Sequence, residues 1–243
     1  MPRRALSNNQ IKQKLHKPEW IKVNFVQGNN YKKVRESANK LNLNTVCQEA
    51  NCPNIYECWE GGTATFMLLG DICTRGCRFC HVKSGNPEGI VDIFEPENTA
   101  NAVRELELDY VVLTSVDRDD LTDGGSSHFA KTVEEIYKKN EGTLIEVLIP
   151  DFSGKIEDLS TVVKSKPTVI AHNIETTREL TSIVRDGRAS YDRSLEVLRN
   201  VKKLDSNIYT KSSIMLGFGE EYTDIITAMK DLREADVDIL TLG

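Results

Sequence analysis

The sequence has no cysteine before Cys47 and none after Cys80, although it contains six in all. Secreted proteins held by disulfides usually spread their cysteines along a shorter chain, so this clustering argues against a disulfide scaffold. No apolar run approaches the roughly 18 residues that a membrane-spanning helix needs. The basic start has no apolar stretch behind it, so no secretory signal peptide is predicted. We therefore expect a soluble, cytoplasmic protein that makes no contact with a membrane.

Basic residues do not balance the acidic ones: 31 Lys and Arg stand against 37 Asp and Glu, and the net charge is -6. Six of the basic residues lie within residues 1–22, where Glu19 is the one acidic residue. The rest of the chain is acidic and shows no basic stripe, so nucleic-acid binding is not predicted. Three interpretations of the basic arm stay open: a docking site for an acidic protein, a solvated terminus or a mitochondrial transit peptide.

Beyond residue 62 the sequence alternates apolar runs with amphipathic stretches. The apolar runs are rich in β-branched residues and mostly continuous, as expected for strands buried on both faces. They lie at residues 65–69, 110–114, 144–149, 168–172, 209–216 and 237–242. Helix-like stretches lie between them at residues 97–108, 126–139, 156–164, 191–204 and 222–235.

This alternation predicts an α/β fold with right-handed crossovers and a parallel sheet. Six strands are fewer than the eight of a closed barrel, so we expect a partial (β/α)6 TIM-like barrel over residues 63–243. Residues 1–62 would form an N-terminal, cysteine-bearing extension. A doubly wound sheet is the alternative. In either architecture ligands gather at the carboxyl ends of the strands, where this sequence becomes polar and rich in glycine.

The six cysteines form two triplets, Cys47-x4-Cys52-x5-Cys58 and Cys73-x3-Cys77-x2-Cys80. Three thiolates can hold a 4Fe-4S cluster and leave one iron open to another ligand. Gly76 lets the backbone turn tightly around such a cluster, and Phe79 would shield it from water. Zinc is the weaker alternative for the second triplet, because closed zinc sites need a fourth ligand, for which only His81 is near. By spacing alone, the first triplet could be an electron-relay cluster or a structural clip.

The second triplet, with an aromatic residue just before its last cysteine, resembles the signature of the radical S-adenosylmethionine (SAM) superfamily. The segments around both triplets resemble one family of that superfamily, the lipoyl synthases. The segments that carry this resemblance are residues 47–59, 70–80, 114–120, 123–125, 172–175, 210–220 and 237–243. Together they extend the resemblance over roughly residues 20–243.

The resemblance implies two 4Fe-4S clusters, one on each triplet. In that family the second-triplet cluster binds SAM at its open iron, and the first-triplet cluster is an auxiliary one that is consumed as the sulfur source. A 5′-deoxyadenosyl radical takes hydrogen from carbons 6 and 8 of an octanoyl chain, and each carbon receives one sulfur. The reaction is thus that of a sulfurtransferase that makes the lipoyl cofactor.

The resemblance also implies partners. The octanoyl chain is amide-linked to a lysine of a lipoyl carrier domain, of the glycine cleavage H protein or 2-oxoacid dehydrogenase E2 type. The electron would come from a donor such as ferredoxin or flavodoxin.

SAM needs further anchors, and polar residues after the predicted strands are the candidates. These candidates are Asn173, Glu175, Asp117, Arg118, Gly217 and Gly219. The polar pair after the fourth strand would bind the ribose or the amino group, and the two glycines would let the backbone approach the adenine. Any of the polar candidates could instead cap a helix or form a salt bridge. His172 is expected to be a satisfied barrel residue rather than a proton donor.

One part of the family pattern has no counterpart in this sequence. The auxiliary cluster of lipoyl synthases takes a fourth ligand from a serine in an Arg-Ser-Ser-Tyr segment beyond the last strand, whereas this sequence ends at Gly243. Residues 188–191 look similar, but they precede a predicted helix, and we expect Ser190 to be its N-cap. We therefore expect either a C-terminally truncated, inactive fragment with apolar surface exposed at its last strand, or a different fourth ligand.

Two other functions were weighed against that of a lipoyl synthase. The first is another sulfur-inserting radical SAM enzyme. Biotin synthases place auxiliary ligands downstream in the barrel, but here no cysteine follows Cys80. Methylthiotransferases have an extra domain before the SAM triplet, but only 72 residues precede Cys73. The second is a non-catalytic iron–sulfur or zinc module, which the cysteines alone would also allow.

Overall fold

An open sheet of seven strands forms the centre of the described part of the chain. The computed structural model describes residues 28–41, 43–49, 52, 54–61 and 63–243. The strand order is β1-β2-β5-β6-β7-β8-β9. The strands are β1 Asn44–Thr45, β2 Thr63–Leu68, β5 Tyr110–Ser115, β6 Leu144–Leu148, β7 Val169–Ala171, β8 Tyr209–Ile214 and β9 Ile239–Leu242. Neighbours from β2 to β9 pair in parallel, whereas β1 is antiparallel to β2.

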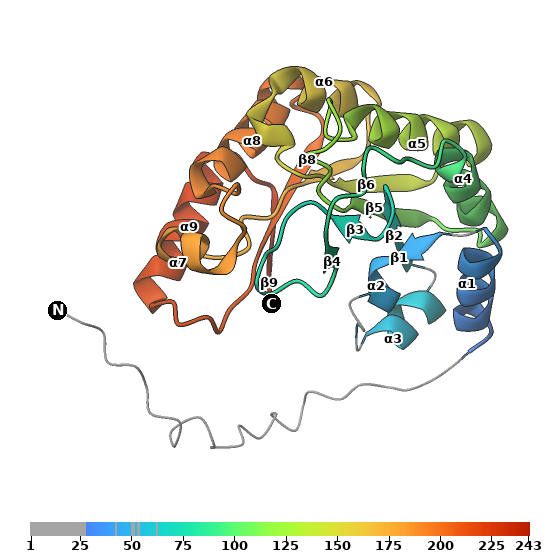
Figure 1. Cartoon of the computed structure of the whole chain (residues 1–243), viewed down its shortest axis with the longest axis horizontal. Coiled ribbons are helices and arrows are strands. Elements are labelled where there is room, and N and C mark those ends of the chain that lie inside the picture. Colours follow the sequence, from blue (N-terminus) through green and yellow to red (C-terminus); the bar gives the residue numbers. More distant parts are fainter. Residues whose placement is uncertain (1–27, 42, 50–51, 53, 62) are drawn as a thin grey trace.

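The sheet is wound in one direction, because its strand order rises from β2 to β9 without reversal. Right-handed crossovers in such a sheet place the connecting helices on one face, whereas a doubly wound sheet reverses its order. Figure 1 shows the helices along the outer side of the strands. They are α4 Glu95–Glu105, α5 Ser126–Lys139, α6 Ile156–Lys164, α7 Arg178–Val184, α8 Tyr191–Leu204 and α9 Tyr222–Glu234. The predicted partial (β/α)6 barrel is confirmed, and the doubly wound alternative is wrong.

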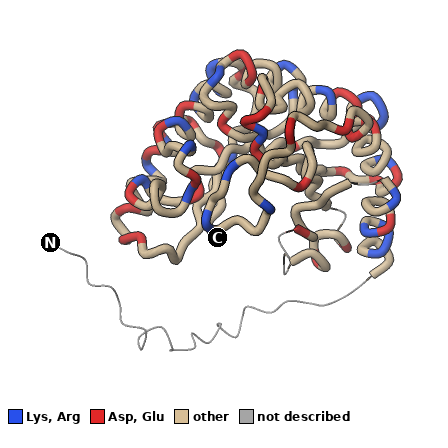
Figure 2. The backbone as a smooth tube through the Cα atoms, viewed as in Figure 1, with Lys and Arg blue, Asp and Glu red and all other residues tan. Residues whose placement is uncertain are grey.

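The core lies between the strands and the inner faces of these helices. Ile145 and Val147 of β6 are fully buried, and so are Phe129, Val133 and Ile136 at helical spacing on α5. Charged residues gather on the outer helices (Figure 2). No helix in the described ranges is both long and apolar enough to cross a membrane.

The expected strands and helices are all present, with ends that differ by a few residues. Beyond residue 62 the sequence pattern missed several short elements. These are α7, the 3-10 turn Phe152–Gly154, and a second, two-stranded sheet of β3 Ile72–Cys73 and β4 Lys83–Ser84. Each is only two to seven residues long, so it is too short to show a clear periodicity.

The N-terminal part packs directly on the barrel edge. It contains α1 Asn29–Lys40, α2 Val46–Glu49 and α3 Ile55–Glu60 as well as β1. Tyr31 of α1 stacks on Tyr56 of α3, with ring centroids 4.9 Å apart, and Trp59 is fully buried in the core that includes Phe66 of β2. The predicted division of the chain at residue 62 stays a prediction.

Candidate functional site: two cysteine triplets at one cavity

The loop that follows β2 carries the second triplet. Leu69 and Gly70 have positive φ angles of 68° and 89°, so the chain turns sharply as it leaves the sheet. The short strands β3 and β4 then pair in parallel, with Cys73 opposite Ser84. The loop therefore folds back on itself around its three cysteines, at the carboxyl end of β2 where a barrel binds its ligands.

Backbone N–H groups point at two of these sulfurs. The N–H groups of Arg75 and Asp117 lie 3.4 and 3.3 Å from Cys73 Sγ, and that of Asp186 lies 3.3 Å from Cys77 Sγ. Hydrogen bonds to cluster sulfurs are one of the means by which proteins adjust iron–sulfur potentials. These N–H groups favour thiolates, whereas Asp117 Oδ2, 3.9 Å from Cys73 Sγ, accepts a hydrogen bond from the thiol form.

Burial makes these thiols hard to ionise without a metal. It raises the pKa of Cys73 to about 11 and also raises the pKa of Cys77, although hydrogen bonds from the backbone oppose both shifts. Metal ligation requires the thiolate, so binding a cluster here would release protons.

One cavity of about 320 Å³ joins the second triplet to the barrel interior. All three of these cysteines line it, and so does Val46, the residue before Cys47 of the first triplet. Much of its wall is apolar. The apolar residues of the wall include Val46, Met67, Phe79, Val82, Val116, Leu148 and Ile149. A largely apolar cavity beside a set of thiols can hold a hydrocarbon chain and keep water away from it.

The first triplet is placed by the antiparallel strand β1. Thr45 ends this strand and begins α2: its Oγ1 accepts the N–H of Gln48 at 3.3 Å and donates to Gln48 Oε1 at 2.7 Å. Cys47 lies on α2, Cys58 lies on α3, and the N–H of Cys52 between them donates to Cys47 O at 3.0 Å. Burial, and then the neighbouring thiols of Cys52 and Cys58, raise the pKa of Cys47.

Trp59 places a buried polar atom, its indole Nε1, beside this triplet. A hydrogen bond from the indole to the Cys47 sulfur opposes the rise in the pKa of that thiol. Such a bond favours the thiolate, the form that ligates a cluster.

The donor sets fit the two predicted clusters. All six cysteines are free thiols, and sulfur ligands suit iron–sulfur clusters, which take one cysteine per iron. In the part of the chain that the structure describes, no three His, Cys, Asp or Glu side chains are arranged to hold a single metal ion. The ligand roles of the six cysteines stay predictions.

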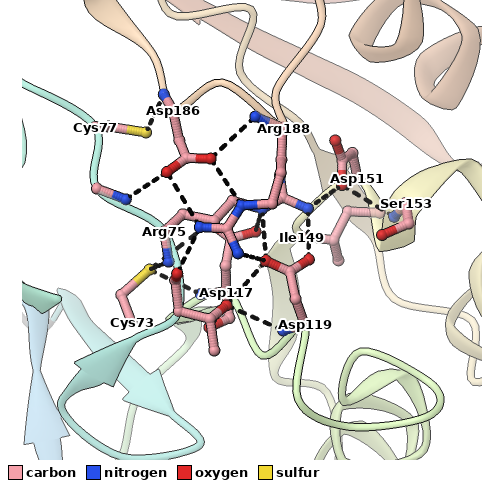
Figure 3. Close-up of polar contacts among 12 residues, drawn as sticks. Cys73, Arg75, Cys77, Asp117, Asp119, Ile149, Asp151, Ser153, Asp186 and Arg188 are labelled. Carbon is pink, nitrogen blue, oxygen red and sulfur yellow. Dashed lines mark hydrogen bonds and ion pairs between the residues drawn. The ribbon is translucent and has the colours of Figure 1, made fainter. Parts of the chain in front are cut away.

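A network of arginines and aspartates fastens the second-triplet loop (Figure 3). The buried Arg75, between Cys73 and Cys77, forms two bonds with Asp119, at 2.9 and 2.8 Å, and one with Asp151 at 2.7 Å. Burial alone would raise the pKa of Asp151, but hydrogen bonding and the charge of Arg75 lower it to about 2. The same arginine lowers the pKa of Asp119 through its hydrogen bonds. Both carboxylates are thus held ionised.

Three of the predicted SAM anchors, Asp117, Asn173 and Glu175, line the cavity. Asn173 Nδ2 lies 3.3 Å from Glu175 Oε1. Glu175 has a φ of 65°, a strained value for a residue other than glycine, and its N–H donates to Ser213 O of β8 at 3.1 Å. Burial raises the pKa of Glu175, and it raises that of Asp117 to about 6. The structure thus brings these three polar side chains to the same cavity as the second triplet.

The other predicted anchors do not line this cavity. The Arg118 guanidinium is fully buried, pairs with Asp120 at 2.8 Å and donates to Leu69 O at 3.1 Å. Gly217 and Gly219 have φ angles of 107° and 101° and belong to an exposed turn after β8. The bonds of Arg118 indicate that it supports the turn after β2. The geometry gives no support to the SAM-binding roles predicted for Arg118, Gly217 and Gly219.

Two smaller expectations are confirmed. Both ring nitrogens of His172 have partners: Nδ1 lies 2.9 Å from Ile149 O and Nε2 lies 2.9 Å from Ser194 Oγ. It is therefore a satisfied barrel residue, as expected. Ser190 is the N-cap of α8, since its hydroxyl accepts the N–H of Arg193 at 3.4 Å.

Sequence reasoning missed Arg75, Arg185 and Ser115 as cavity residues. Ser115 follows the last residue predicted for its strand, and its buried hydroxyl has no partner among the described residues. Its position at a strand end was a usable signal. Arg75 and Arg185 carried no such signal. Arg75 is placed by carboxylates far away in the sequence, and Arg185 by bonds to Ile174 O and Ser194 Oγ on other elements.

Comparisons with known proteins bear on the whole chain. The family model of the radical SAM superfamily matches residues 67–232. That of the N-terminal domain of lipoyl synthase of the radical SAM family matches residues 4–52.

Curated relatives are similar over nearly the full chain. The lipoyl synthase of Myxococcus xanthus is 52% identical over 227 residues, which are 93% of this chain and 76% of the relative. That of Thermus thermophilus is 54% identical over 228 residues, 94% of this chain and 71% of the relative. The mitochondrial lipoyl synthase of Drosophila melanogaster is 52% identical over 95% of this chain and 63% of the relative.

Solved structures share the fold at low sequence identity. Methylornithine synthase has a TM-score of 0.59 and 17% identity, over 74% of this chain and 52% of that one. The FeFe-hydrogenase maturase of Carboxydothermus hydrogenoformans has a TM-score of 0.60 and 15% identity, over 74% of this chain and 44% of that one.

Proposed function

Since this chain belongs to the lipoyl synthase family of the radical SAM superfamily, we propose that it inserts two sulfur atoms into a protein-bound octanoyl chain, at carbons 6 and 8. The product is a dihydrolipoyl group on a lysine of a lipoyl carrier domain. The carrier is of the glycine cleavage H protein or 2-oxoacid dehydrogenase E2 type, the electron donor is a ferredoxin or flavodoxin, and the reducing cytoplasm is the compartment.

The observation that carries this proposal is one largely apolar cavity, which all three cysteines of the second triplet line and which Val46, the residue before Cys47 of the first triplet, also lines. Cys73, Cys77 and Cys80 would hold a 4Fe-4S cluster, and Asp117, Asn173 and Glu175 would bind the SAM on it. With SAM bound, this cluster would supply the radical that removes hydrogen from a methylene carbon. No base of ordinary strength could deprotonate such a carbon.

The chain's own residues position the substrate and exclude water. The apolar wall accepts the octanoyl chain, so a carbon stripped of hydrogen stays away from solvent. The first triplet lies at the other side of this space and would present the sulfur-donating cluster, which is a substrate of the reaction. When carbon and sulfur lie within about 3–3.5 Å, the carbon–sulfur bond can form before the carbon radical is lost to a side reaction.

The test is anaerobic turnover of the reconstituted chain with an octanoyl-lysine peptide, SAM and a reductant. Mass spectrometry should find two sulfurs added to the peptide, and chromatography should find 5′-deoxyadenosine. Cys73→Ala should form neither product. Cys47→Ala should still form 5′-deoxyadenosine but add no sulfur. Full sulfur insertion by Cys47→Ala would refute the role given to the first triplet.

A further inference from the structure

The loop of the second triplet has little regular structure of its own. Its only strands, β3 and β4, are two residues each, yet its cysteines must keep fixed distances to ligate one cluster. Side chains from three other parts of the barrel hold it in place.

The first hold is Arg75, whose side chain is only 5% exposed. Its guanidinium contacts Asp119 and Asp117, from the end of β5, and Asp151, from the end of β6, at 2.8, 3.4 and 2.7 Å respectively. Asp151 also pairs with Arg193 of α8 at 3.3 Å. A planar guanidinium can bond several carboxylates at once at fixed angles, which an ammonium cannot do.

The second hold is the turn after α7. Asp186 accepts the N–H of Gly76 at 2.8 Å and is itself bonded by Arg188 at 2.9 Å. Arg188 reaches back to the loop, donating to Thr74 O at 2.6 Å, and pairs with Asp119 at 3.3 Å. Figure 3 shows Asp186 and Arg188 on one side of Arg75 and Asp117 and Asp119 on the other.

Both sets of contacts involve the residues that donate hydrogen bonds to the cysteine sulfurs. In the described residues, the backbone N–H groups that donate to Cys73 and Cys77 belong to Arg75, Asp117 and Asp186. The side chain of each of these three residues is a member of the network. The network therefore fixes the direction in which each N–H points.

We propose that Arg75, Asp186 and Arg188 are positioning residues that aim three backbone N–H groups at Cys73 and Cys77, and so set the stability and potential of the cluster held there. This rests on the proposed function in so far as the second triplet holds a cluster. Among the described residues, the hydrogen bonds from Arg75 and Asp186 to the sulfurs come from their backbone N–H groups, so these side chains act through the backbone.

The test uses the full chain with the first triplet replaced (Cys47→Ala, Cys52→Ala and Cys58→Ala), so that one cluster remains. After anaerobic reconstitution this parent should bind about four irons per chain. A parent that binds none would overturn the proposed function itself. Arg75→Lys, Arg75→Met and Arg188→Met are then introduced separately. The matched control is Arg178→Met, since Arg178 pairs with Asp192 and Asp231 away from the loop.

We expect the loop variants to lose iron to a chelator about tenfold faster than the parent and to shift its reduction potential, whereas Arg178→Met should do neither. Arg75→Lys should not restore the chelator resistance of the parent, because lysine keeps the positive charge but lacks the planar guanidinium that bonds several carboxylates. In the metal-free chain, hydrogen exchange over residues 71–85 should be faster in the loop variants.

Arg188 is half exposed, so Arg188→Met should fold even if the Arg75 variants do not. A folded Arg188→Met with unchanged chelator resistance, potential and hydrogen exchange would overturn the proposal.

Discussion

At the scale of single residues, burial decides the charge of the polar groups around the cavity. His172 is fully buried between Ile149 and Ser194, so desolvation, and then the nearby Arg185, lower its pKa to about 4. The neutral ring can donate from Nδ1 and accept at Nε2, which satisfies both neighbours. A protonated ring would bring a second positive charge next to the Arg185 guanidinium, which already donates to Ser194 Oγ.

This histidine predicts a loss of stability in acid. An unfolded chain takes up the proton near pH 6.5, but the folded chain does so only near pH 4. Stability should therefore fall as the pH drops from 6.5 to 4, by about 3 kcal/mol from this residue. Urea unfolding of the metal-free chain between pH 7 and pH 4 would measure it.

The control for that measurement is His172→Gln, which should be less stable at pH 7 but should lack this part of the pH dependence. Asp117, with its pKa raised to about 6, changes stability in the opposite direction, so the difference between parent and variant isolates the histidine. Identical slopes in the two proteins would contradict the prediction.

The sequence was most informative where function is carried by residue type and local spacing. The six cysteines could be identified as ligand candidates because three thiols within a few residues reach one small object. The partners of Arg75 could not, because Asp151 lies 76 residues away in sequence and meets it only after the barrel forms. Arg118 was predicted at the cofactor, but its buried bond to Leu69 O, 49 residues away, depends on the same long-range folding.

At the scale of elements, strands buried on both faces and helices with one apolar face were predictable from their periodicity. β1 was not, since two residues carry no period and its pairing with β2 spans a long loop. It is also the element that leads into Val46 and Cys47, of which Val46 lines the cavity. The part of the site that sequence reasoning could not place is thus held by a strand of only two residues.

The start of α5 shows how closely two elements approach. Gly125 has a φ of 88° and lies against Leu69, where a Cβ would come within 2.3 Å of Leu69 Cδ1. Gly125→Ala should cost about 1–3 kcal/mol in the free energy of unfolding, because it combines backbone strain with a clash. Chemical denaturation measures this cost.

Gly142→Ala is the matched control, because Gly142 has nearly the same φ, 87°, but has nothing within 4 Å of its Cβ position. It should show only the backbone strain, about 1 kcal/mol. Equal losses in the two variants would mean that packing against Leu69 contributes nothing.

At the scale of the whole molecule, the sheet is open, with β1 at one edge and β9 at the other. Among the described residues β9 has no partner strand along that edge, and its Ile239 and Leu242 side chains are 42% and 47% exposed. Exposed apolar edge strands favour pairing between chains.

We therefore expect the polypeptide of residues 1–243, taken by itself, to associate as its concentration rises. Leu242→Lys should shift it toward the monomer, since a charge on an edge strand disfavours pairing. Sedimentation velocity at several concentrations would detect this. Ile183→Lys, at an equally exposed position on α7, should leave association unchanged. Association that is the same in all three proteins would show that β9 takes no part.

The register in which β1 pairs with β2 sets the position of the first cysteine triplet relative to the second. Each residue advances a strand by about 3.3 Å, so a slip of one place along β2 would carry Cys47 that far and turn neighbouring side chains to the opposite face. That displacement is as long as the contact that carbon and sulfur must make. The register that sets Asn44 opposite Met67 is therefore needed for the proposed reaction. A shift of β1 along β2 would deliver sulfur to the wrong carbon of the substrate chain.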